Sequence, residues 1–197
     1  MIKLKSAAVG FKEWLLVCDA LASGRQSLII RKGGIAEGRG GFQWQCREFF
    51  LFPTLFHQQR EQVTWTPGAQ AEADLAQENQ ITIRHAARLE WHGRVGDWEA
   101  AAALQPHHVW KEEVIRERFG YGEETGLSVG VVRVFRLAEP KILPMEPRFG
   151  GCRSWVDLPE LADVSGDSWT PVLSDEAHAE RLALLETLLP GRASGIS

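Results

Sequence analysis

The stretch ITIRHAARLEW, residues 81–91, carries the strongest strand pattern in the sequence. Apolar residues occupy every second position from Ile81 to Trp91 except for His85, and mostly polar residues lie between them. Because successive side chains of a strand point to opposite faces, this alternation predicts a strand with one buried face. It also places His85 on the apolar side, where we expect a core histidine.

Two neighbouring segments predict strands that are covered on both faces. Residues 128–137, SVGVVRVFRL, and residues 48–53, EFFLFP, contain apolar runs without strict alternation. Further strands are expected at 26–31 and 42–47. An apolar stripe at helical spacing, formed by Phe11, Trp14, Leu15, Cys18 and Leu21, predicts a helix over 11–21. Other helices are expected at 55–61, 69–77, 98–104, 106–119 and 175–189.

The order of these elements indicates the fold class. Helices and strands follow one another without a regular βαβ rhythm, which predicts an α+β fold. We expect a curved, mostly antiparallel sheet or a partly open barrel with flanking helices. A chain of 197 residues with 44% hydrophobic content can bury one sizeable core. We therefore expect a single α+β core domain over 1–160, with an extended acidic segment and a C-terminal helix over 161–197 packed on it.

Charge is distributed unevenly along the chain, whose net charge is -4. Residues 1–60 hold nine Lys or Arg against four acidic residues, whereas residues 157–186 hold eight acidic residues and one arginine. The basic third favours a polyanionic partner. Alternatively, the acidic segment folds across the basic region and neutralises it, or it docks a protein partner. The sequence leaves these interpretations open.

The cysteines and the apolar segments bear on location. Cys18, Cys46 and Cys152 are odd in number and far apart, which fits neither a disulfide framework nor a zinc site. This predicts a reducing, cytoplasmic environment. The sequence contains no 18-residue apolar window and no signal peptide, so no membrane association is expected.

The segment RKGGI, residues 31–35, follows an apolar run and opens a glycine-rich loop. A phosphate-binding loop needs glycines that lead directly into a helix, whose free N–H groups hold the anion. Here the loop leads into FQWQC, which is typical of a strand. The segment therefore predicts a hairpin, which is either an ordinary mobile turn or a means for Arg31, Lys32 and Arg39 to contact a nucleic-acid backbone.

Evidence for catalysis is limited to short patterns. His57 and Glu61 lie four residues apart after the EFFLFPT strand and could bind a metal with a third ligand, with Gln58 beside them. EETGL, residues 123–127, matches only the end of a Nudix box, because glycines interrupt the helix that the box requires. The nuclease-like Glu-x-Lys pattern at 139–141 contains a proline. No cofactor and no bound metal are predicted, and the sequence does not decide whether the protein is an enzyme.

Four stretches carry a family resemblance: FKEWLLVCDAL, SLIIRKGGI, REFFLFPTLFHQ and VIRERFGYGEETGL. Together they resemble a bacterial family classed as a domain of unknown function, over residues 10–160. The most specific pieces are RKGGI and FLFPT with the following His57 and Gln58. The resemblance implies an association with Mrr-type restriction endonuclease domains, and therefore a role in restriction. It implies no catalytic residue.

We therefore predict a non-catalytic module that recognises a nucleic acid or a nucleotide. The expected site residues fall into two groups, polyanion-binding cations and pocket-lining residues: Arg31, Lys32 and Arg39; His57, Gln58 and Glu61. The alternatives are a metal-dependent hydrolase or nuclease that uses His57 and Glu61, and a protein-interaction module that uses the segment 157–186.

Overall fold

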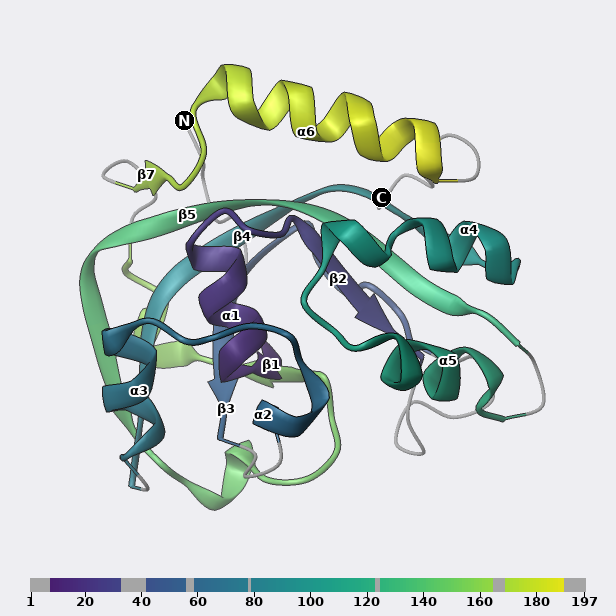
Figure 1. The fold of residues 1–197 in the computed structure, drawn as a ribbon. Coiled ribbons are helices and arrows are strands. Elements are labelled where there is room, and N and C mark those ends of the chain that lie inside the picture. Colours follow the sequence, from purple (N-terminus) through teal and green to yellow (C-terminus); the bar gives the residue numbers. More distant parts are fainter. Residues whose placement is uncertain are drawn as a thin grey trace.

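A computed structural model describes residues 8–32, 42–55, 59–77, 79–122, 125–164 and 169–189. Its centre is a strongly curled seven-stranded sheet with the order β2-β5-β4-β3-β1-β6, and β7 pairs with β5 outside that order (Figure 1). The strands are β1 (Val9–Trp14), β2 (Leu28–Arg31), β3 (Glu48–Thr54), β4 (Gln80–Val95), β5 (Leu127–Pro144), β6 (Trp155–Asp157) and β7 (Thr170–Pro171). Only β1 and β3 are parallel among these described strands. The predicted α+β fold with a curved, mostly antiparallel sheet is confirmed.

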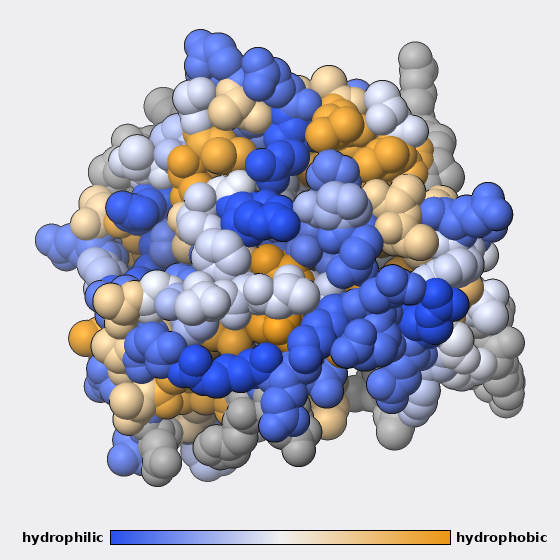
Figure 2. Space-filling model, viewed as in Figure 1, coloured by the Kyte–Doolittle hydropathy of each residue, from blue (hydrophilic) through white to orange (hydrophobic). Residues whose placement is uncertain are grey.

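Helices surround this sheet. In Figure 1, α1 and α3 lie in front of it, α4 and α5 cover its right-hand part, and α6 crosses above β4 and β5. The described helices are α1 (Leu15–Ala22), α2 (Gln59–Gln62), α3 (Ala69–Leu75), α4 (Trp98–Ala103), α5 (Glu112–Gly120) and α6 (Asp175–Leu188). None of these described helices is long and apolar enough to cross a membrane. Figure 2 shows mostly hydrophilic residues on the same face of the molecule, with apolar residues between them.

Two apolar clusters lie on the two faces of the sheet, and β3 contributes to both. Phe49 and Leu51 pack in the first cluster, whereas Phe50 and Phe52 pack in the second. All four side chains are buried. The apolar run EFFLFP therefore forms a strand covered on both faces, as its pattern predicts.

An irregularity in the pairing of β4 with β5 changes the predicted alternation. Ile83 pairs with Lys141 but His85 pairs with Arg136, so one residue of β4 lies opposite four residues of β5. Ile81 and Ile83 pack in the second cluster, but Ala87 and Leu89 pack in the first. One uninterrupted apolar face was therefore the wrong expectation, because the side chains of β4 change faces where its register with β5 shifts.

The predicted helix over 11–21 is only partly correct. Residues up to Trp14 form β1, and the helix begins at Leu15. The parallel pairing of β1 with β3 sets this boundary, since Phe11 lies opposite Leu51 and Trp14 opposite Thr54. Apolar residues three or four apart cannot reveal such a pairing, because the partner strand lies far along the chain.

Two more boundaries differ from expectation. Residues 42–47 form no strand. The helix expected from Pro106 begins only at Glu112, after a short 3₁₀ turn and a bridge between Val63 and Trp110. By contrast, two helices begin where the sequence predicts, and each start has a side-chain cap: Asp97 accepts from the Ala100 N–H of α4, and Ser174 from the Ala177 N–H of α6.

The acidic segment contacts the sheet through α6. Leu185 is buried in the first apolar cluster, and Asp175 pairs with Arg133 of β5. In the N-terminal part of the acidic segment, Glu160 pairs with Arg148. Both arginines lie outside residues 1–60, so these acids do not neutralise the basic third of the chain.

Candidate functional site

The C-terminal end of β1 holds a buried acidic side chain. Glu13 is only 1% exposed, and strand alternation places it on the same side of β1 as Phe11. Its Oε1 accepts from the Trp14 N–H at 2.8 Å. Its Oε2 is enclosed and accepts no hydrogen bond from the described residues. Such an unsatisfied buried oxygen is costly and marks a position worth explaining by function.

Arg31, the last residue of β2, faces this carboxyl group. Its Nε lies 4.0 Å from Glu13 Oε2, and its guanidinium lies 4.7 Å from the centre of the Phe11 ring. One Nη2 hydrogen is donated to the Lys12 carbonyl. The side chain is 21% exposed, although its Nε is enclosed.

Arg118 of α5 supplies a second guanidinium. It lies 3.7 Å from the centre of the Trp110 ring and 5.5 Å from that of Trp14, a stacked arrangement that favours a cation. Burial lowers the pKa of Arg118 to about 10, and the charge of Glu13 opposes this shift. The group therefore stays charged at neutral pH. It donates no hydrogen bond to any residue that the structure describes, and none of its nitrogens is enclosed.

Lys32 fixes the end of α5. Its Nζ donates to the carbonyl of Phe119 at 3.2 Å and to that of Gly126 at 3.1 Å. A cation at the C-terminal end of a helix is also favoured by the helix dipole. Lys32 thereby joins β2 to the turn of α5 that carries Arg118.

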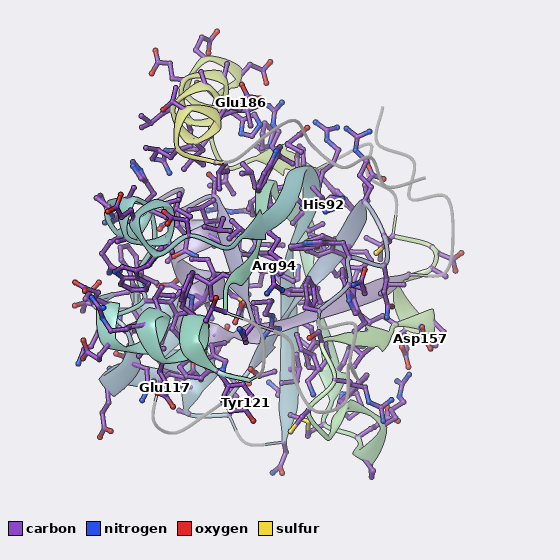
Figure 3. The ribbon with its side chains drawn as sticks, turned by 90° about the vertical axis from the view of Figure 1, so that its right-hand side faces the viewer. His92, Arg94, Glu117, Tyr121, Asp157 and Glu186 are labelled. Carbon is purple, nitrogen blue, oxygen red and sulfur yellow. The ribbon has the colours of Figure 1, made fainter. Side chains whose placement is uncertain are left out.

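Glu13, Arg31, Lys32 and Arg118 are called the charged cluster below. The two guanidiniums of Arg31 and Arg118 lie near the one buried carboxylate of Glu13, and the charge of Glu117 on α5 also acts on Arg118. Guanidiniums beside aromatic rings suit an anionic ligand, because Arg presents planar donors that match phosphate or carboxylate groups. Figure 3 shows this side of the molecule, with Glu117 on α5 and Tyr121 just after it.

Not every predicted site residue can be placed. Arg39, His57 and Gln58 lie outside the described residues. Glu61 is exposed on α2. Lys32 and Arg31 both belong to the charged cluster, although each also donates to backbone carbonyls.

Buried Gln59 connects the predicted pocket segment to the charged cluster. Its Oε1 accepts from the Leu16 N–H at 3.0 Å, and its Nε2 donates to the Thr54 carbonyl at 2.9 Å. The Thr54 hydroxyl in turn donates to the Glu13 carbonyl at 3.1 Å. Thr54 and Gln59 flank His57 and Gln58 in the sequence.

The sequence analysis missed Glu13 and Arg118. Glu13 fell on the polar side of the predicted helix over 11–21, and Arg118 fell on the outer side of a helix. Because Val9–Trp14 form a strand and not a helix, alternation places Glu13 on the same side as buried Phe11. The only available signal was an acidic residue within the apolar context FKEWLL.

Metal ligands and two of the cysteines can be compared with the structure. No three His, Cys, Asp or Glu side chains in the described part of the chain form a group suited to a metal ion. Burial raises the pKa of the Cys18 thiol well above its ordinary value and that of Cys46 to about 11, so neither is an activated nucleophile. Glu139 and Lys141 pair with each other at 3.8 Å.

Comparison with known proteins gives one family and distant structural likenesses. No curated protein matches the chain. Among solved structures, the S128A mutant of ZmASCH from Zymomonas mobilis has a TM-score of 0.46 at 11% identity, covering 90% of this chain and 96% of the other. ASCH from the same organism has a TM-score of 0.41 at 14% identity, covering 91% and 95%. The family model DUF1802, a domain of unknown function, matches residues 10–183, and the chain belongs to this family.

Proposed function

We propose that the charged cluster binds the phosphate of a nucleic acid or a nucleotide. One observation carries this proposal: the Arg118 guanidinium is held on Trp110, yet it donates no hydrogen bond within the described part of the chain. An arginine that is fixed by stacking and left with free donors is prepared to bind an anion, because little side-chain entropy is lost on binding.

Arg31 also lies near the carboxyl group of Glu13. Glu13 keeps the two guanidiniums near each other by reducing their repulsion, but it balances only one of them. A phosphate would supply the missing negative charge. In a partly buried site this interaction is stronger than at an open surface.

The remaining predicted residues fit the same proposal. Arg39 follows Lys32 within the glycine-rich segment, and His57 and Gln58 lie between the two anchors Thr54 and Gln59. We expect them to add contacts to the ligand around the charged cluster. A restriction-associated role, implied by the family resemblance, would require the ligand to be DNA.

The test is a binding titration followed by fluorescence anisotropy. Labelled single-stranded RNA, single-stranded DNA, duplex DNA and a fluorescent ATP analogue are the probes, at about 20 mM and about 200 mM salt. We expect Arg118→Gln to weaken binding by about tenfold and to reduce the salt slope by about one.

Arg116→Gln is the matched control. Arg116 lies on the same helix and also stacks on a tryptophan, with its guanidinium 4.1 Å from the Trp98 ring, but it pairs with Glu112 on the helix surface. We expect this variant to bind like the wild type. Absence of binding to every probe at low salt, or equal losses in the two variants, would refute the proposal.

A further inference from the structure

A cavity of about 490 Å³ lies between α1, α3 and the part of the sheet formed by β3, β4 and β5. Helices α1 and α3 lie side by side in front of these strands (Figure 1). The volume falls within the range of small-molecule sites, roughly 300 to 1,000 Å³. None of the four residues of the charged cluster lines this cavity, so it is a separate candidate site.

Two acidic residues of the cavity wall already have partners. Asp74 of α3 accepts two hydrogen bonds from Arg84 of β4, from Nη2 at 3.0 Å and from Nε at 3.2 Å. Asp19 of α1 accepts from the Trp65 Nε1–H at 2.7 Å and from the Gly68 N–H at 3.1 Å. Arg84 balances the charge of Asp74, whereas Asp19 is bound by neutral N–H donors and keeps one negative charge in the cavity wall.

His85 of β4 lines the cavity without a hydrogen bond to any described residue. Its Nε2 is enclosed and has no partner, whereas Nδ1 is not enclosed. A buried N–H without a partner is costly, so the neutral ring is expected to carry its proton on Nδ1. Burial, with the nearby Arg136 and Arg84, lowers the pKa of His85 to about 4, so the ring is neutral near neutral pH.

Arg136 of β5 lies directly opposite His85 in the register of the two strands. It lines the same cavity and is exposed, and it forms no hydrogen bond or ion pair with any residue of the described ranges. Among the described residues, the cavity thus offers one guanidinium that has no ion pair, next to one N–H donor. The rest of its wall is largely apolar, with Leu15, Leu51 and Leu137 from three different elements.

We propose that this cavity binds a small organic anion, whose carboxylate or phosphate is received by Arg136 and by the His85 Nδ1–H. The apolar body of the ligand packs on Leu15, Leu51 and Leu137. The irregularity after Ile83 makes this arrangement, because it takes His85 out of the regular alternation and sets it beside Arg84 and opposite Arg136. This proposal is independent of the function proposed for the charged cluster.

The experiment uses the full chain and three probes of one shape: benzoate, phenyl phosphate and the uncharged benzyl alcohol. Amide chemical shifts of the ¹⁵N-labelled protein report both affinity and location. We expect the two anions to shift signals of residues in α1, α3 and β4 around the cavity, and benzyl alcohol to bind about tenfold more weakly.

Arg136→Gln is expected to weaken the binding of both anions by about tenfold, and His85→Phe to weaken it by a smaller factor. Arg153→Gln is the matched control, because Arg153 is also exposed and lies outside the cavity lining. Three results would overturn the proposal: no shifts around the cavity, equal affinity for benzyl alcohol, or wild-type affinity in Arg136→Gln. Anion binding that is lost in Arg118→Gln and kept in Arg136→Gln would assign the probes to the charged cluster and likewise reject this site.

Discussion

The charged cluster and the cavity beside α1 each contain two arginines and a buried group without a hydrogen-bond partner, but they differ in how the charges are compensated. In the cavity, Arg84 is paired with Asp74 through two hydrogen bonds, whereas exposed Arg136 and the carboxylate of Asp19 have no ion pair among the described residues. In the charged cluster, Arg31 and Arg118 share the single carboxylate of Glu13, which lies 4.0 Å from the nearer one. The charged side chains of the cavity wall therefore sum to zero without a ligand. In the cluster, the two arginines depend on the one buried charge of Glu13.

The largest expected effect follows from removing that charge. Glu13→Gln keeps the size of the side chain but leaves Arg31 and Arg118 without their counter-ion. We expect the free energy of unfolding to fall by about 3 kcal/mol, as for other broken buried ion pairs. Urea unfolding at neutral pH measures this loss.

An added anion should partly restore the Glu13→Gln variant. Sodium sulfate is expected to raise its unfolding midpoint more than that of the wild type, relative to sodium chloride at equal ionic strength. Wild-type stability in this variant would show that the two guanidiniums do not need Glu13, and the contrast between the two regions would be lost.

A second prediction uses pH to separate the regions. His85 has a pKa of about 4 in the folded protein against an ordinary value of 6.5. The unfolded chain binds the proton first, so the stability contributed by the neutral ring is present above pH 6.5 and is lost as pH falls toward 4. In His85→Asn, we expect the free energy of unfolding to fall less on acidification than in the wild type, by on the order of 2 kcal/mol. The difference is not larger because solvent at the cavity screens part of the charge on a protonated His85.

Buried His108 titrates in the same window, since burial also lowers its pKa to about 4. The comparison that matters is therefore the change in unfolding free energy between pH 6.5 and 4.5 in the wild type and in His85→Asn. An organic anion bound at Arg136 should raise the pKa of His85 but not that of His108, which NMR titration of the two rings would detect. Identical slopes in the two proteins would contradict the assignment of a neutral, buried His85.

The smallest expected effect concerns the paired wall of the cavity. Asp74→Asn weakens the interaction with Arg84. Both partners are less buried than Glu13, so we expect the free energy of unfolding to fall by only about 1 kcal/mol. Arg116→Gln, which breaks the exposed pair with Glu112, provides the surface reference at about 0.3 kcal/mol. If Asp74→Asn cost as much as Glu13→Gln, the cavity wall would be as dependent on its charges as the cluster is.

Local sequence patterns were sufficient for the elements that bury apolar faces. The runs at 48–53 and 128–137 and the alternation after Ile81 each identify a strand, because burial of a pleated surface leaves a period of two or a continuous apolar run. Asp97 and Ser174 identify helix starts, because a side-chain oxygen satisfies free N–H groups there. The α+β class follows from the order of these elements.

The tertiary structure alone decided where charge is concentrated. Glu13 joins Arg31 and Arg118 only because β1 pairs in parallel with β3 and the sheet curls until the end of β2 approaches β1. His85 faces Arg136 only because an irregularity shifts the register of β4 against β5. A sequence pattern reports the environment of neighbours along one element, whereas these contacts join residues that lie between about 18 and 105 positions apart, so their geometry is fixed by the packing of the whole sheet.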